Sequence, residues 1–185
     1  MKPLVYCEGI EEILARGIDP RSEEATFLYW SRIAASVAML SLCEVAKCGA
    51  ALVGRSPFIP DPLFSGALVS TGFNMPPGGW ENRRCGKTQP SKLHPKADRT
   101  CCVHAEVKAL LYVPRERIVG STLYFARVDE KGSILPSGAP YCTGCSKVAL
   151  EAGVAHWVLW HEDGPRRYGA EEYNDLSHDF DGRES

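Results

Sequence analysis

Helical periodicity is clearest in the first quarter of the chain, after Asp19-Pro20. Aspartate is a favoured N-cap residue, proline suits the first helical position, and two glutamates follow in the first turn. Apolar residues, among them Phe27 and Trp30, then recur every three or four positions to about Cys43. This spacing predicts one long amphipathic helix whose aromatic stripe packs into the core.

Short apolar runs between turn residues predict four strands, of which the first two form an antiparallel pair. These strands are 49–53, 66–70, 121–128 and 155–160. Helical spacing also predicts helices at 103–111, 142–151 and 170–178. This alternation of helices and strands predicts an α/β fold with three α/β/α layers, in which a mixed central sheet carries helices on both faces.

The length of 185 residues suits a single domain. Residues 1–18 are expected to form an N-terminal extension, 72–102 an irregular loop insertion and 179–185 a disordered tail. The net charge of −2 gives no general attraction to nucleic acid. A polynucleotide is therefore not an expected partner. No apolar run approaches the length of a membrane span, so a membrane is not an expected partner either.

The redox compartment is indicated by the eight cysteines. Disulfide-dense scaffolds are usually shorter chains, and a C-x-x-C pair directly before a helical pattern suits metal thiolates in a reducing compartment. The first residues also lack the continuous apolar core of a signal peptide. These features together predict a cytoplasmic protein.

Two short motifs carry the chemistry: His104-Ala105-Glu106, and Cys142 with Cys145. One imidazole and two thiolates can hold a zinc ion and leave its fourth position open for water, whose pKa zinc lowers toward neutrality. A glutamate without this neighbour would be interpreted as a solvated carboxylate on the helix surface. Because Glu106 lies two residues after His104, it is placed to move the proton of that water. The spacing is that of hydrolytic nucleobase deaminases.

The chain resembles the cytidine/deoxycytidylate deaminase superfamily over roughly 27–160, and is most similar to deoxycytidylate deaminases. Besides the two motifs, four segments carry the resemblance: Cys48-Gly49-Ala50-Ala51-Leu52-Val53, Thr71-Gly72-Phe73-Asn74, Val103 to Leu110, and Thr122-Leu123-Tyr124-Phe125. The chain differs from the pattern at Tyr141, which separates Pro140 from Cys142, and at Lys108, where many relatives have asparagine. Residues 128–140 look more like the corresponding loop of free cytidine deaminases.

The resemblance implies a cytidine-deaminase-like fold and roles for several residues. Glu106 would be the catalytic proton shuttle, while the backbone N–H of Ala105 and the side chain of Asn74 would orient the substrate. Asn74 has an equal alternative as a turn residue in left-handed conformation. Aromatic candidates for stacking on the base are Phe73, Trp80 and Tyr141, each of which is individually more often a packing residue. Candidate partners of a 5′-phosphate are Arg83, Arg84 and Arg127.

A second, structural zinc is a further hypothesis. Its candidate ligands are Cys85, His94, Cys101 and Cys102, with Cys43 or Cys48 approaching from the end of the long helix. The alternative, thiols without a metal beside a surface histidine, is favoured because the spacings match no standard zinc knuckle.

The favoured function is therefore zinc-dependent hydrolysis of deoxycytidylate to deoxyuridylate and ammonia, by an enzyme that the resemblance implies is a homo-oligomer. A free cytidine or deoxycytidine deaminase is the first alternative. Deamination of guanine, adenosine or a cytosine in a polynucleotide comes next. A non-catalytic zinc domain, with Cys101 or Cys102 as a fourth ligand, is the alternative from a different class.

Overall fold

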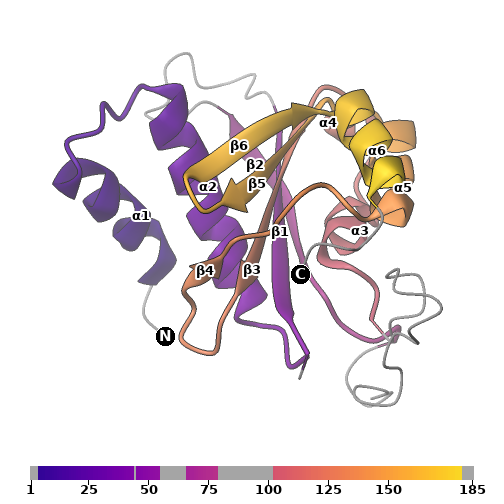
Figure 1. Cartoon of the computed structure of the whole chain (residues 1–185), viewed down its shortest axis with the longest axis horizontal. Coiled ribbons are helices and arrows are strands. Elements are labelled where there is room, and N and C mark those ends of the chain that lie inside the picture. Colours follow the sequence, from indigo (N-terminus) through magenta and orange to yellow (C-terminus); the bar gives the residue numbers. More distant parts are fainter. Residues whose placement is uncertain (1–3, 44, 55–65, 79–101, 181–185) are drawn as a thin grey trace.

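The computed structural model describes residues 4–43, 45–54, 66–78 and 102–180. The elements follow one another in a mixed order of helices and strands (Figure 1). They are α1 (Leu4–Ala15), α2 (Glu23–Ala38), β1 (Lys47–Gly54), β2 (Ala67–Phe73), α3 (Ala105–Leu110), α4 (Arg115–Ile118), β3 (Thr122–Val128), β4 (Ile134–Leu135), α5 (Thr143–Ala152), β5 (His156–His161), β6 (Gly164–Gly169) and α6 (Ala170–Asp179).

The strands form one mixed sheet in the order β2-β1-β3-β5-β6, with the short β4 paired to the end of β3. β1 runs antiparallel to both β2 and β3, whereas β3 and β5 are parallel. β5 and β6 form an antiparallel hairpin at one edge. The predicted antiparallel pair of the first two strands and the mixed character of the sheet are therefore confirmed.

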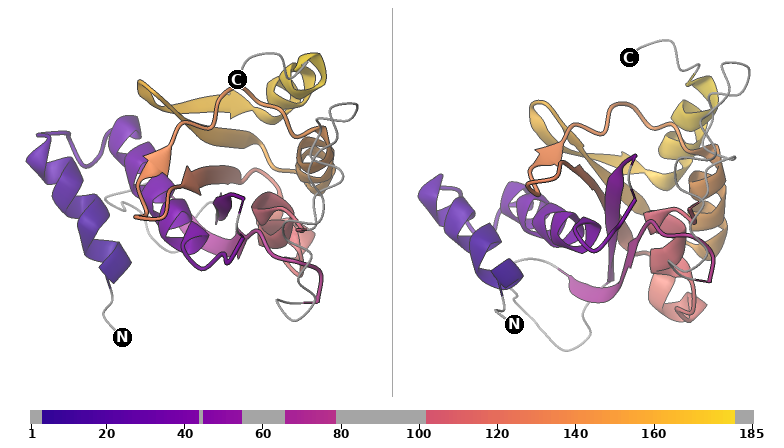
Figure 2. Two further views of the ribbon diagram at one scale, coloured as in Figure 1. Left: turned by 60° about the horizontal axis from the view of Figure 1, so that its bottom comes forward. Right: turned by 90° about the horizontal axis from the view of Figure 1, so that it is seen from below.

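Helices cover both faces of this sheet, as predicted (Figures 1 and 2). Side chains of a strand alternate between its faces, so each strand supplies two separate cores. In β3, Leu123 faces the core beneath α3, α5 and α6, and Tyr124 faces the core beneath α2. α1 packs on the outer side of α2, where its residue Ile13 is fully buried. The three-layer α/β/α architecture is confirmed.

The long helix is shorter than its pattern predicted at both ends. Ser22, not Asp19, caps α2: the Ser22 hydroxyl accepts the Ala25 N–H at 3.0 Å. Asp19 instead accepts the Arg21 N–H at 2.9 Å in the turn before the helix. The helix ends at Ala38, and the predicted continuation to Cys43 is a loop.

Several elements were absent from the prediction. Residues 1–18 contain the helix α1, and the segments that form α4, β4 and β6 show no clear periodicity in the sequence. β6 has the sequence Gly-Pro-Arg-Arg-Tyr-Gly, and its strand conformation comes from pairing with β5 at the sheet edge. β2 extends to Phe73, into the expected insertion, and α6 extends to Asp179, into the expected tail. No helix in the described part of the chain is long and apolar enough to cross a membrane.

Candidate metal centre

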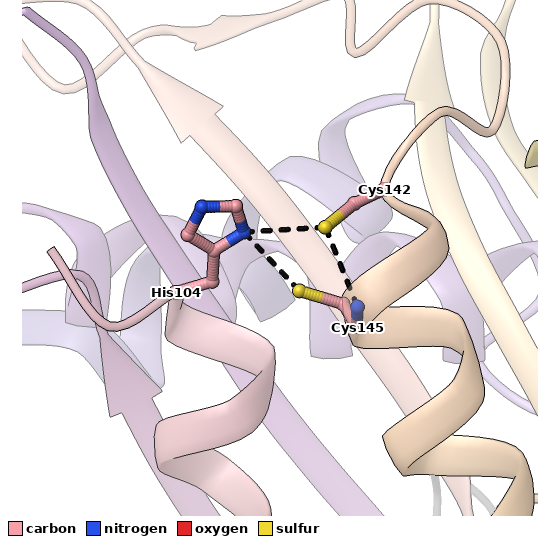
Figure 3. A group of neighbouring side chains, drawn as sticks. All are labelled: His104, Cys142 and Cys145. Atoms are coloured by element: carbon pink, nitrogen blue, oxygen red, sulfur yellow. Dashed lines mark hydrogen bonds between the residues drawn. The ribbon is translucent and has the colours of Figure 1, made fainter. Parts of the chain in front are cut away.

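His104, Cys142 and Cys145 meet at the starts of two helices on the same face of the sheet (Figure 3). His104 is the N-cap residue of α3 and Cys142 is the N-cap residue of α5. The His104 Nδ1 atom lies 3.2 Å from the Cys145 Sγ and 3.3 Å from the Cys142 Sγ. The structure thus brings together three residues that the sequence singled out from two distant segments.

The geometry of the three donor atoms suits a tetrahedral metal ion. Zinc bonds of about 2.3 Å to sulfur and 2.0–2.1 Å to nitrogen place the two donors roughly 3.5 Å apart. The nitrogen–sulfur distances here are only slightly shorter, and all three donor atoms lie within 4.8 Å of one another. Among the described residues no further His, Cys, Asp or Glu joins this group. The three residues therefore fit a metal ion held by one imidazole and two thiolates.

The protonation of the two thiols also favours metal binding. A hydrogen bond with Cys145 is the main cause that lowers the pKa of Cys142 to about 4, and it raises the pKa of Cys145. The backbone N–H of Cys145 also donates to the Cys142 sulfur at 3.4 Å, as expected at a helix N-terminus. The hydrogen bond between the two sulfurs therefore favours one thiolate in the pair, beside the imidazole.

Glu106 lies in the first turn of α3 with only 6% of its surface exposed. Burial raises the pKa of its carboxyl group; the nearby His104 opposes this rise and Cys142 adds to it. Such a buried carboxyl group next to a metal-binding cluster has the position and the pKa direction of a proton-transfer group. It is not one of the three clustered donors.

Asn74 follows the last residue of β2, and both ends of its buried amide contact backbone atoms. Its Oδ1 accepts the Cys48 N–H and its Nδ2 donates to the Ala46 carbonyl, each at 2.9 Å. In the described part of the chain Tyr112 is the one non-glycine residue with a positive φ. The left-handed turn conformation considered for Asn74 is therefore wrong.

The other described candidates for substrate contact are Ala105, Tyr141 and Phe73. Ala105, the first residue of α3, is fully buried, and an N–H at this position has no acceptor within its own helix. Tyr141 directly precedes Cys142 and its ring centroid lies 5.8 Å from that of Phe180. Burial raises the pKa of Tyr141, and Glu106 adds to the rise. Phe73 is half-buried at the end of β2.

Two further residues lie near the cluster: Tyr173, which sequence reasoning missed, and Cys48, which it considered only for a second metal. Tyr173 on α6 is 2% exposed and stacks on Trp157 with ring centroids 4.1 Å apart. Burial raises its pKa, with further contributions from Glu106 and Cys142. Burial also raises the pKa of Cys48 to about 12, and Glu106 adds to this rise. Helical spacing predicted α6, but no local signal shows which side chains it brings to the metal ligands.

Comparison with known proteins identifies the family. No family model matches the chain. A curated relative, the deoxycytidylate deaminase of Mycobacterium phage D29, is 32% identical over 137 residues, which are 70% of this chain and 90% of that protein. The chain belongs to the cytidine/deoxycytidylate deaminase superfamily.

Solved structures with a similar fold include two deaminases. One is the dCMP deaminase from the cyanophage S-TIM5 in apo form, with a TM-score of 0.49, 22% identity, and coverage of 74% of this chain and 82% of that chain. The other is cytidine deaminase from Mycobacterium tuberculosis, with a TM-score of 0.39, 20% identity, and coverage of 83% and 94%.

Membership of the deaminase superfamily makes the protein a hydrolase that acts on a C–N bond in a cyclic amidine. The non-catalytic zinc domain is correspondingly disfavoured.

Several of the residues that the sequence suggested for phosphate, stacking or a second metal lie outside the described residues: Trp80, Arg83, Arg84, Cys85, His94 and Cys101. Of the other candidates for a second metal, Cys43, Cys48 and Cys102 form no group of three potential ligands within the described residues.

Proposed function

We propose that the protein is a zinc-dependent deaminase that converts deoxycytidylate to deoxyuridylate and ammonia. The observation that carries this proposal is the convergence of His104, Cys142 and Cys145 beside the buried carboxyl group of Glu106. The choice of substrate is supported by the phage relative, which is a deoxycytidylate deaminase.

In this proposal the three clustered residues hold zinc, because one imidazole and two thiolates are donors that zinc prefers. When bound, zinc supplies a Lewis acid that makes water a nucleophile at neutral pH. The buried position of the two cysteines keeps their sulfurs from competing solvent contacts. Both cysteines come from one turn of α5, so their relative placement is set locally.

Glu106 then carries the protons of the reaction. Its carboxylate takes a proton from the attacking water and delivers it to the ring nitrogen next to the reacting carbon. The carboxylate then takes the second proton from the new hydroxyl group on that carbon and passes it to the exocyclic amino group. This group leaves as ammonia when the C–N bond breaks and the C=O bond of the uracil ring forms. Burial suits this task because it raises the pKa of the carboxyl group, which makes its carboxylate a better proton acceptor than an exposed one.

Substrate orientation is assigned to residues around this centre. The Ala105 N–H, the Asn74 side chain and the Tyr141 ring would contact the base or sugar. Arg83 and Arg84 would contact the 5′-phosphate, because a guanidinium matches phosphate oxygens with planar donors.

Free cytidine or deoxycytidine is the second candidate substrate. It is favoured by residues 128–140, which look more like the corresponding loop of free cytidine deaminases.

The chemistry is tested with Glu106→Gln, which keeps the size of the side chain and removes its proton transfer. We expect one zinc per chain and an unchanged fold, with kcat/KM reduced by about 10²–10⁴-fold. Zinc content, circular dichroism and cytosine-to-uracil conversion measure these three quantities. Glu151→Gln on the exposed side of α5 is the matched control and should behave as wild type. Wild-type activity in Glu106→Gln would refute the assigned role.

The substrate is tested with a panel of cytosine, cytidine, deoxycytidine, their monophosphates, guanine and adenosine. We expect a higher kcat/KM for deoxycytidylate than for deoxycytidine. Arg83→Ala with Arg84→Ala should lower the rate with the monophosphate and leave the rate with the nucleoside unchanged. Equal or reversed preference in the wild type rejects the phosphate-binding role without affecting the hydrolytic chemistry.

A further inference from the structure

Asn74 lies where β1 and β2 stop pairing through backbone atoms alone. The last pair of the ladder is Gly49 with Phe73, and the backbone N–H of Asn74 still donates to the Cys48 carbonyl at 3.1 Å. Beyond this point the contacts are made by the Asn74 side chain. Its Oδ1 accepts the Cys48 N–H and its Nδ2 donates to the Ala46 carbonyl oxygen. The amide thus occupies the place of one more pair of the ladder and holds the start of β1.

The loop after α2 is tied to the same residue. The Ser41 hydroxyl donates to the Asn74 carbonyl oxygen at 2.9 Å and accepts the Cys43 N–H at 3.2 Å. The Ser41 carbonyl oxygen accepts a hydrogen bond from the Lys47 ammonium group at 2.8 Å. Ser41 is fully buried and Asn74 is 7% exposed, so these bonds are shielded from water. One residue therefore connects the end of β2, the start of β1 and the α2–β1 loop.

This connection continues directly to a residue of the metal cluster. Met75, next to Asn74, forms an isolated bridge with Val103 through hydrogen bonds of 3.3 and 2.9 Å. Val103 immediately precedes His104. On the other side of Asn74, the backbone of Gly72 lies against the first turn of α3, since a Cβ there would be 2.3 Å from the Ala105 carbonyl oxygen. His104 is therefore placed by the segment whose centre is Asn74.

We infer that Asn74 is a positioning residue of the deaminase site, which fixes His104 for metal binding by joining β1, β2 and the α2–β1 loop. This inference rests on the proposed function and extends the substrate contact considered for Asn74. Groups that orient a metal ligand typically change metal affinity by 10–100-fold when they are removed. A residue that only contacts substrate has no such effect on the metal.

Two substitutions at Asn74 and one at Ser41 separate the roles. Asn74→Ala leaves the Ala46 carbonyl and the Cys48 N–H without their partner. Asn74→Asp keeps an acceptor for Cys48 and places an oxygen against the Ala46 carbonyl. Ser41→Ala removes the bond to Asn74 from a fully buried site that substrate does not reach. Ser36→Ala, which removes a hydroxyl bonded to the Arg32 carbonyl within α2, is the matched control.

Zinc affinity is measured on the folded protein by competition with a chromophoric chelator, a readout that needs no turnover. We expect affinity to fall about 10–100-fold in both Asn74 variants and in the same direction, by a smaller factor, in Ser41→Ala. Ser36→Ala should match the wild type. With saturating zinc, kcat should fall in the Asn74 and Ser41 variants more than KM rises.

Wild-type zinc affinity in Asn74→Ala, with only KM raised, would overturn the inference and leave a substrate contact. Wild-type affinity and kcat in Ser41→Ala would overturn it as well. If Asn74→Ala does not fold, Asn74→Asp and Ser41→Ala provide the same comparison. A wild-type protein that binds zinc and converts no cytosine compound would reject the proposed function, while the affinity comparison would still decide the positioning role.

Discussion

At Gly72 the backbone of β2 lies close against that of α3, and we expect Gly72→Ala to displace the helix that begins at His104. A Cβ at this position would lie 2.3 Å from the Ala105 carbonyl oxygen and 2.4 Å from the Ala109 nitrogen. Real Cβ atoms essentially never approach another heavy atom within 3.0 Å. Both neighbours are backbone atoms, so no side-chain rotation relieves the clash. α3 must therefore retreat from β2 by about 0.7 Å or more.

Two magnitudes follow from this displacement. Overpacking of this kind costs about 1–3 kcal/mol, which corresponds to a Tm lowered by roughly 2–12 °C in a domain of this size. His104 and Glu106 both belong to the start of α3, and a misplacement of 1 Å can cost about 100-fold in rate. We expect kcat/KM to fall by roughly 10–100-fold in the folded variant.

Thermal unfolding, chelator competition and steady-state kinetics measure these effects. The control is Ile13→Ala, which removes a fully buried side chain on α1, in the layer opposite α3. It should cost about 2–5 kcal/mol of stability and leave the kcat/KM of the folded protein unchanged. Wild-type kcat/KM in Gly72→Ala would refute the reasoning. So would a loss in Ile13→Ala as large as that in Gly72→Ala.

Two further predictions concern the cysteines. Burial raises the pKa of the Cys48 thiol from 9.0 to about 12, so we expect this thiol to be alkylated at pH 8.5 at least ~100-fold more slowly in the folded than in the denatured protein. Site-resolved mass spectrometry measures both rates, and equal rates would contradict this prediction. Because the unfolded state loses this proton first, the stability that Cys48 contributes should decline from about pH 9 to pH 12. Chelation of zinc should remove about 4 kcal/mol of stability when free zinc exceeds its Kd 1,000-fold. Cys142→Ser should lose this response, and a chelator-independent Tm in the wild type would contradict the metal assignment.

Much of the fold could be predicted because its signals are local. Helical spacing placed α2, α3, α5 and α6, and the apolar runs placed β1, β2, β3 and β5. The prediction was wrong where a tertiary contact decides the local structure. The Ser41 hydroxyl bonds to Asn74 in the loop where the apolar pattern of α2 still continues, and β6 is a strand because β5 lies beside it. Short polar segments carry too little periodicity to reveal such contacts.

The residue types of the candidate site were readable for the same reason. Cys142 and Cys145 are one helical turn apart, and Glu106 follows His104 by two positions, so each half of the site is encoded within a few residues. Asn74 illustrates the limit: its residue type allowed a substrate contact or a left-handed turn. Its observed hydrogen bonds to Ala46 and Cys48 are a third role that depends on a strand 26 residues away.

By itself the amino-acid sequence identified the candidate metal ligands and the candidate proton-transfer carboxylate, because short motifs at helix starts specify chemistry locally. Only the tertiary structure decided that the His104 nitrogen meets sulfurs 38 and 41 residues away, and that Tyr173 from the last helix joins the buried core that contains those sulfurs. Those contacts depend on how the helices pack on a shared sheet, for example through the close backbone contact at Gly72. Packing of this kind produces no periodic pattern in the sequence, so it could not be predicted from the sequence.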